Sequence, residues 1–159
     1  MDTSKIKTDM TYKLSGPLEY AHKGEMISSD FIEFKSPNSE NMQLVCKLKQ
    51  MVMRAMREAQ SSTKNVSEEE LKSAKSKSDE MTGPQLIALI LMSEKVDYYE
   101  FFATGKQLIT CGVGHLGGEQ KLNQPLVEKL PAEEVENIIG EYVATFILAS
   151  YLRSLDQGR

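Results

Sequence analysis

The chain contains no tryptophan and has only two cysteines and two histidines among its 159 residues. A structural zinc site takes four ligands, usually from Cys and His, and Cys46, Cys111, His22 and His115 are scattered over separate segments. We therefore expect no metal and no other cofactor. The two distant thiols do not form a disulfide framework. Reduced, structural cysteines are favoured over one disulfide or one reactive thiol, because a free cysteine often behaves as a small buried hydrophobe.

The chain also lacks a long hydrophobic run and an excess of positive charge. Its longest apolar stretch, 143–152, is broken by Thr145 and Ser150 and is shorter than the ~20 residues that span a bilayer. Residues 1–9 have no apolar core, so we expect no signal peptide. The formal net charge is −4 and the pI is about 5.3, which argues against a nucleic-acid binder. The expectation is a cytoplasmic protein that binds neither membranes nor nucleic acids.

With 40 % hydrophobic and 26 % charged residues, the chain has enough apolar material for the core of one domain. Residues 1–10 are polar and are expected to be a disordered tail. Residues 11–159 are expected to form a single domain. Within that domain, residues 60–81 are rich in Ser, Lys and Glu and predict a polar connection, either a solvated linker or a partly helical, mobile segment.

The N-terminal third of the chain predicts a β-hairpin. Two apolar or aromatic runs, 12–20 and 26–34, flank a Gly-containing turn at 22–25. The clearest strand is Phe31–Phe34. Gly16 and Pro17 interrupt the first run, so the first strand is expected to carry a bend or to lie at an edge.

Later segments have apolar residues at helical spacing. Residues 41–59 contain neither Gly nor Pro, while Thr82–Pro84, Asp97 and Leu130–Glu134 are of the types that open helices. Residues 86–92 are apolar nearly all round, so this helix is expected to be buried. The predicted fold is α+β but mainly α, with an N-terminal β-hairpin followed by a bundle of four to five helices.

Residues 109–123 are rich in glycine and predict a turn or a small hairpin. Within them, Gly112–Gly117 matches G-x-G-x-x-G, a dinucleotide-binding pattern that needs a strand before it and a helix N-terminus after it. Here the residues up to Pro125 open no helix. Cys111 and His115 lack the third, orienting group of a Cys–His catalytic pair. We therefore expect no enzymatic activity. An enzyme of unknown type is the alternative, and it predicts a polar cleft with perturbed pKa values.

The nine methionines are the most informative feature of the composition. Four of them fall on the helix expected at 41–59. Methionine is flexible and polarisable, and it is common where a surface accepts varied apolar partners. Two interpretations stay open. Either these side chains all pack internally, or a partner-binding groove is formed by Met42, Leu44, Met51, Met53 and Met56.

The last helix combines an acidic start with a broad apolar face. Glu133 and Glu134 are interpreted as partners of the helix dipole and as solvated surface. The apolar residues that follow cover more than a narrow stripe. Because a lone helix does not keep such a face exposed to water, we expect self-association into a homo-oligomer through Val143, Ile147 and Tyr151.

The order of these features resembles a known family. The segment Tyr12–Tyr20, the turn Lys23–Glu25 and the segment Phe31–Pro37 resemble the N-terminus of tail assembly chaperones of long-tailed, siphovirus-like bacteriophages. Those proteins begin with a hairpin and continue in helices. The stretches 92–101 and 140–146 are similar to their helical half. The polar segment 61–80 is not part of the family pattern, so no binding residue is carried over.

The resemblance implies a function in phage tail morphogenesis. Such a chaperone binds the long tape measure protein in the host cell cytoplasm, keeps it soluble, and is absent from the mature virion. Contact with tail tube subunits is a further implication. An amphipathic helix of the client would bury its apolar face in a hydrophobic groove. The alternative from the residues is an adaptor or regulatory module, of phage or bacterial origin, that sequesters a single host protein.

Overall fold

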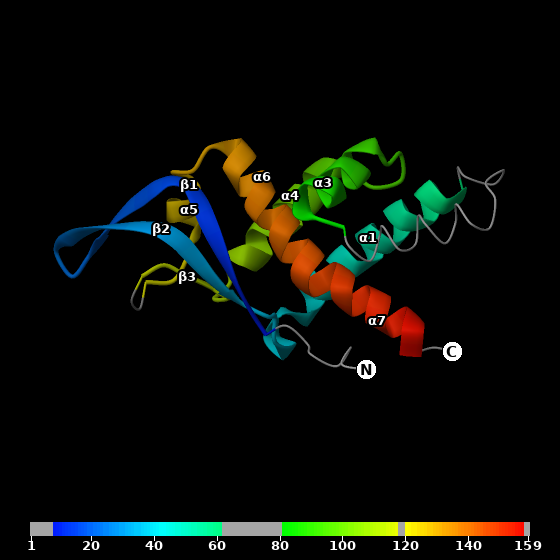
Figure 1. Cartoon of the computed structure of the whole chain (residues 1–159), viewed down its shortest axis with the longest axis horizontal. Coiled ribbons are helices and arrows are strands. Elements are labelled where there is room, and N and C mark those ends of the chain that lie inside the picture. Colours follow the sequence, from blue (N-terminus) through cyan, green and yellow to red (C-terminus); the bar gives the residue numbers. More distant parts are fainter. Residues whose placement is uncertain (1–7, 62–80, 118–119, 158–159) are drawn as a thin grey trace.

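The computed structural model describes residues 8–61, 81–117 and 120–157. Two long antiparallel strands, β1 (Asp9–His22) and β2 (Glu25–Lys35), form the N-terminal hairpin, and β3 (Gly114–His115) pairs with β2. The helical elements are η1 (Ser39–Asn41), α1 (Met42–Ser61), α3 (Gly83–Met92), α4 (Tyr98–Ile109), α5 (Gln124–Val127), α6 (Ala132–Tyr142), the π-helical segment η2 (Val143–Leu148) and α7 (Ala149–Gln157). The hairpin projects from one end of the helical part (Figure 1). The predicted fold class is confirmed.

The hairpin turns through two residues, Lys23 and Gly24, with φ of 53° and 82°. Positive φ at both positions matches the twist of a two-residue hairpin loop, and glycine adopts it without steric cost. His22 pairs directly with Glu25 across this loop. At the other end, Asp9 pairs with Lys35. The strand therefore starts inside the segment expected to be a disordered tail, and residues 1–7 lie outside the described part of the chain.

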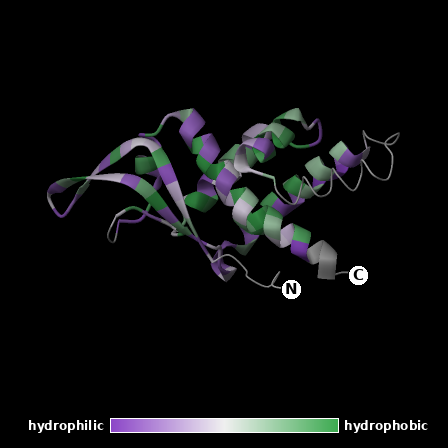
Figure 2. Ribbon diagram, viewed as in Figure 1, coloured by the Kyte–Doolittle hydropathy of each residue, from purple (hydrophilic) through white to green (hydrophobic). Residues whose placement is uncertain are grey.

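The hairpin buries one face against the helices. Ile32 and Phe34 of β2 and Leu14, Leu18 and Tyr20 of β1 are almost fully buried. The ribbon shows the resulting bands of hydrophobic and hydrophilic residues (Figure 2). The pairing register shifts between Lys13 and Leu18, where Gly16 and Pro17 stand. The predicted bend in the first strand is thus an enlarged bulge, in which residues 14–17 of β1 stand opposite the single residue Asp30 of β2.

Local capping residues start the helices where the sequence places them. Asn38 caps η1, Thr82 and Gln85 form a reciprocal capping box at α3, and the Asp97 carboxylate accepts the Tyr99 backbone N–H at 2.9 Å. α1 continues to Ser61, and the rest of the expected polar connection, 62–80, lies outside the described residues.

Three features of the helical part differ from expectation. α3 is not buried all round, since Leu91 and Met92 are 55 % and 82 % exposed. The Gly-rich segment supplies β3 and a bridge between His115 and Lys121, followed by the unpredicted short helix α5. The expected last helix is α-helical in α6 and α7 but π-helical between them. π-Helical turns are rare, and they occur mostly as single turns inside α-helices, often at functional sites.

α6 carries polar side chains that bond to several other elements. Its Glu134 accepts the Ser15 backbone N–H at 2.7 Å and the Ser15 hydroxyl at 3.1 Å. Glu136 accepts the Tyr98 hydroxyl of α4. Glu134 was expected to be solvated surface, but it is only 7 % exposed. Both glutamates bond because α6 lies between the hairpin and the other helices (Figure 1).

Further along α6, Glu141 accepts the Gly83 backbone N–H at 3.3 Å. A carboxylate at a helix N-terminus is favourable, because the first N–H groups there lack helical partners. The Tyr142 hydroxyl donates to the Lys35 carbonyl at 3.0 Å, which joins α6 to the end of β2. Hydrogen bonds thus join α6 to α3, α4 and both hairpin strands, in addition to apolar packing.

α3 and α6 cross at two glycines, so that their backbones approach closely. A Cβ atom on Gly140 would lie 2.8 Å from both the Gly83 carbonyl oxygen and the Ile87 side chain. Within a helix, alanine is normally more favourable than glycine by about 1 kcal/mol. At Gly140, however, the added Cβ atom would overlap with the backbone of α3, which cannot shift without an energetic cost.

We therefore expect Gly140→Ala to lower the free energy of unfolding by about 1–3 kcal/mol, as in overpacked cores, measured by urea denaturation. The control is Gly16→Ala in β1, where an added Cβ meets no atom within 4 Å. That change should stay within about 0.5 kcal/mol. Equal stability of both variants would contradict the close crossing.

Glu134→Ala removes the acceptor of the Ser15 N–H and of the Tyr12 hydroxyl, which donates to Glu134 at 3.3 Å. Leaving part-buried donors unpaired should cost about 1–3 kcal/mol of unfolding free energy. Glu133 precedes it in the same helical turn and is exposed. Glu133→Ala should therefore be nearly neutral. If the two variants melt alike, Glu134 does not anchor the hairpin.

Burial first, and then the negative charge of Glu134, raises the pKa of Tyr12 to about 12. A pKa raised above the unfolded value of 10.0 stabilises the fold fully below pH 10, and this contribution is lost as the pH rises to about 12. NMR titration of ring-labelled tyrosine should show this pKa. In Glu134→Gln it should fall below 12 yet stay above 10, because the burial remains. Glu133→Gln should leave the pKa unchanged.

Candidate functional site

The methionine-rich helix divides between the core and the surface. Met51 and Met56 are 6 % and 7 % exposed, Leu44 and Met53 are half-buried, and Met42 is 48 % exposed. α1 packs against α3, α4 and η2, which cover the side that carries Met51 and Met56. These two residues are therefore corrected from partner-binding candidates to core residues. Of the five, Met42 is the one most open to a partner.

The apolar face of the last helix is also largely internal. Val143 and Ile147 are 1 % and 0 % exposed, and Tyr151 is half-buried. Both buried residues belong to η2, which packs against α1 and α3. The broad apolar face predicted here is thus needed by the chain's own core. Val143 and Ile147 are not available for self-association.

A groove of about 220 Å³ lies beside Met42, between the start of α1 and the η2–α7 segment. Val45 and Phe146 line it and are 5 % and 6 % exposed, so they form its floor. Pro37 and Met42 provide apolar walls. The lining also includes two cationic residues, Lys49 and Arg153, and three hydroxyl residues, Ser36, Thr145 and Ser150.

Two bonds fix the groove in place. The Asn41 side-chain amide donates to the Cys111 sulfur at 3.0 Å, which ties the start of α1 to the end of α4. On the other wall, the rings of Tyr142 and Phe146 lie 4.8 Å apart between centroids. Because the Tyr142 hydroxyl is bonded to Lys35, the position of Phe146 is set from the hairpin side.

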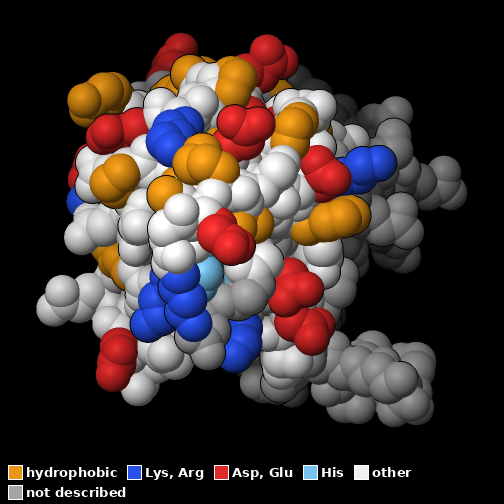
Figure 3. Space-filling view, turned by 90° about the vertical axis from the view of Figure 1, so that its left-hand side faces the viewer, with side chains coloured by type: hydrophobic (Ala, Val, Ile, Leu, Met, Phe, Trp, Pro, Cys, Tyr) orange, Lys and Arg blue, Asp and Glu red, His pale blue; other side chains and the backbone are white. Residues whose placement is uncertain are grey.

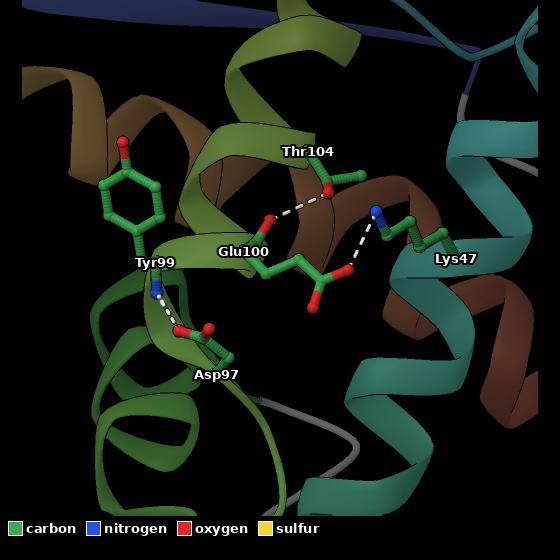
Figure 4. Close-up of polar contacts among 5 residues, drawn as sticks. All are labelled: Lys47, Asp97, Tyr99, Glu100 and Thr104. Atoms are coloured by element: carbon green, nitrogen blue, oxygen red, sulfur yellow. Dashed lines mark hydrogen bonds and ion pairs between the residues drawn. The ribbon is translucent and has the colours of Figure 1, made fainter.

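A second cavity, of about 290 Å³, lies between α1 and the start of α4. The Lys47 ammonium and the Glu100 carboxylate form an ion pair across it at 2.9 Å (Figure 4). Asp97 caps the N-terminus of α4. The Thr104 hydroxyl donates to the backbone carbonyl of Glu100, which lies one turn earlier in the same helix (Figure 4). Since the two charges are about half exposed, the ion pair contributes little stability. We therefore interpret this cavity as a gap in the packing between α1 and α4.

The pKa shifts within the described residues follow from burial and from hydrogen bonds that hold the fold together. Burial raises the pKa of the Cys111 thiol, which disfavours the reactive thiolate. Burial also raises the pKa of Tyr142 and of Tyr98, the latter with help from Glu136. The low pKa of Glu58 follows from hydrogen bonds donated by the Ser93 hydroxyl and the Glu94 N–H, which hold the loop after α3.

Other predicted binding features can be placed as well. Among the described residues, no three His, Cys, Asp or Glu side chains lie close enough together to hold a metal ion. The G-x-G-x-x-G match, Gly112–Gly117, contains β3, and the next helix, α5, starts only at Gln124. Among the described helices, none combines the length and the hydropathy that a membrane-spanning helix requires.

The hairpin end of the molecule offers a mixed surface. Viewed from that end, hydrophobic side chains are interspersed with acidic and basic ones, and basic side chains gather next to a histidine (Figure 3). Isolated apolar side chains of this kind are normal on a protein surface. A cavity of about 440 Å³ lies where the ends of β1, β2 and β3 meet, and Met10 and Phe34 are the apolar residues of its otherwise polar and charged lining. Its lining is therefore more polar than that of the groove beside Met42.

No known protein family, curated protein or solved structure matches this chain.

Sequence patterns alone do not identify all the residues of the groove. Met42 was singled out by residue type, but Phe146 and Arg153 come from a helix about 100 residues later, and nothing local pairs them with α1. The part of the groove that the sequence does indicate is the apolar start of α1, where Met42 precedes Val45 by three residues and therefore lies next to it on the helix surface.

Proposed function

We propose that this chain is a tail assembly chaperone of long-tailed bacteriophages, and that it binds an amphipathic helix of the tape measure protein in the groove beside Met42. The observation that carries the proposal is an exposed methionine over an apolar floor, at the meeting of two helices. A flexible thioether adapts to different side chains, which suits a client that presents many similar registers. Helix-in-groove binding is the recognition mode that such a shape supports.

The size of the groove favours an anchoring side chain over a small-molecule ligand. Pockets for small molecules usually measure about 300–1,000 Å³, whereas this groove measures about 220 Å³. One or two apolar side chains of a partner helix would fill it. Well-packed anchors of this kind carry much of the binding energy of protein interfaces.

The charges around the groove define the client further. Lys49 and Arg153 line it, and neither belongs to the ion pair found in the described part of the chain, which joins Lys47 and Glu100. Cations beside an apolar floor favour a client helix whose apolar stripe is flanked by Glu or Asp. The proposed activity is binding without catalysis, in the host cell cytoplasm, with tail tube subunits as a further partner.

The decisive test is co-expression with the tape measure protein, with the soluble fraction of that protein as the readout. Met42→Glu places a charge over the apolar floor and should weaken binding at least roughly tenfold, because an anchor is lost. Met42 is the first residue of α1, where an acidic side chain is favourable, so the fold should persist by circular dichroism. The control is Met26→Glu, at an exposed methionine of the hairpin, which should bind normally.

Two synthetic helical peptides separate this client from other partners. Both carry the same apolar stripe, one flanked by Glu and one by Lys, and the Glu-flanked peptide should bind more tightly. A tape measure protein that stays insoluble with the wild-type chain, or binding that Met42→Glu leaves intact, would overturn the proposal. Tight binding of a single host protein without any effect on the tape measure protein would favour the adaptor alternative.

A further inference from the structure

The first strand has one side that faces away from the rest of the sheet, since the strand order is β1-β2-β3. In an antiparallel strand the backbone groups of successive residues point alternately to its two sides. The Lys35 N–H donates to the Val113 carbonyl at 2.8 Å, on the β3 side of β2, and Lys35 stands opposite Asp9. The N–H and C=O groups of Asp9, and by alternation those of Thr11 and Lys13, therefore point to the outer side of β1. We name these three residues the β1 edge.

The backbone groups of the β1 edge are unpaired. The alternation continues to Ser15, whose N–H is accepted by Glu134 at 2.7 Å, so α6 closes the outer side of the strand at the bulge. Before the bulge, no other residue that the structure describes bonds to the outward N–H and C=O groups. The three side chains of the β1 edge are exposed. A regular strand edge with free donors and acceptors is a template for pairing with another strand.

We propose that the β1 edge pairs with the β1 edge of a second copy of this chain, antiparallel and centred on Thr11. A two-fold interface places the same patch of each copy against itself. Asp9 of one copy then lies opposite Lys13 of the other, and Thr11 lies opposite its counterpart. Each opposed pair can exchange two N–H···O=C bonds, because the backbone groups of both members point outward. The proposal does not rest on the client-binding groove, which none of these residues lines.

The charges of the strand favour a second copy as the occupant. Asp9 and Lys13 lie four residues apart, so their side chains project from the same face of the sheet. In the register centred on Thr11, both charged contacts join opposite signs, which stabilises cross-strand pairs. Centring the pairing on Asp9 or on Lys13 would instead bring like charges together. Asp9 also stands opposite Lys35 in the hairpin, but among the described residues these two form no ion pair.

The other face of the strand fits the same register. Met10 and Tyr12 are half-buried and pack against the core. With the pairing centred on Thr11, Met10 of one copy lies opposite Tyr12 of the other. A methionine sulfur next to an aromatic ring is a favourable contact. Each of these side chains would therefore lose some of its remaining exposure to water.

The dimer should be weak. A stable interface buries about 800 Å² on each partner, and residues 9–13 of one strand supply only part of this area. We expect a Kd on the order of 100 μM. Sedimentation equilibrium over about 10 μM to 1 mM protein should then show the wild-type chain passing from monomer to dimer.

Charge reversal tests the register. Asp9→Lys and Lys13→Asp should each raise the Kd of the dimer at least roughly tenfold, because like charges then meet at both charged contacts. A 1:1 mixture of the two variants should recover the dimer, and so should the double variant Asp9→Lys/Lys13→Asp. The control is Glu25→Lys, at an exposed residue of β2, which changes the net charge as Asp9→Lys does. It should dimerise as the wild type does.

The backbone bonds can be tested separately from the charges. Thr11→Pro removes the central outward N–H, and an edge strand tolerates proline where its N–H faces solvent. This variant should keep the native circular dichroism spectrum and stay monomeric. In the wild-type chain, amide hydrogen exchange at Thr11 should slow as the protein concentration rises. Exchange at Met10, whose N–H points to β2 by the same alternation, should not depend on concentration.

A wild-type chain that stays monomeric to about 1 mM, or an Asp9→Lys variant that dimerises as tightly as the wild type, would overturn the proposal. A dimer in which the Thr11 amide exchanges as in the monomer would also overturn it. If a monomeric chain instead binds an extended client peptide along β1, the edge belongs to the client. Should Thr11→Pro lose the native spectrum, the charge variants and amide exchange decide. These measurements use the chain alone, so their failure leaves the groove beside Met42 untouched.

Discussion

The contact between α6 and the hairpin is the one on which the rest of the structure depends. A two-stranded β-ribbon is at best marginally stable in water, so β1 and β2 need a partner for their apolar face. α6 provides that partner and bonds to both strands, to Ser15 through Glu134 and to Lys35 through Tyr142. The bond to Ser15 lies at the β-bulge, where the regular ladder is interrupted and a backbone N–H is free to bond elsewhere. The interrupted ladder therefore explains why the Ser15 N–H is available, and the buried Glu134 carboxylate is the acceptor that satisfies it.

The same contact also sets the position of the groove. Tyr142 touches Phe34 of β2 on one side and Phe146 on the other, with ring centroids 5.4 and 4.8 Å apart. Phe146 belongs to the π-helical segment, where bonds run from i to i+5 and residues four to five apart share one face. Phe146 and Ile147 lie four and five residues after Tyr142, so both share its buried face. The small exposed part of Phe146 contributes to the floor of the groove.

The hairpin and the helix starts could be predicted because their causes are local. Gly24 is required by the turn, and Thr82 and Asp97 bond to backbone N–H groups two or three residues away. Burial could not be predicted in the same way. Met51 and Met42 are the same residue type on the same helix, and only the packing of other helices makes one core and the other surface. The role of Glu134 likewise depends on a strand about 120 residues earlier in the chain.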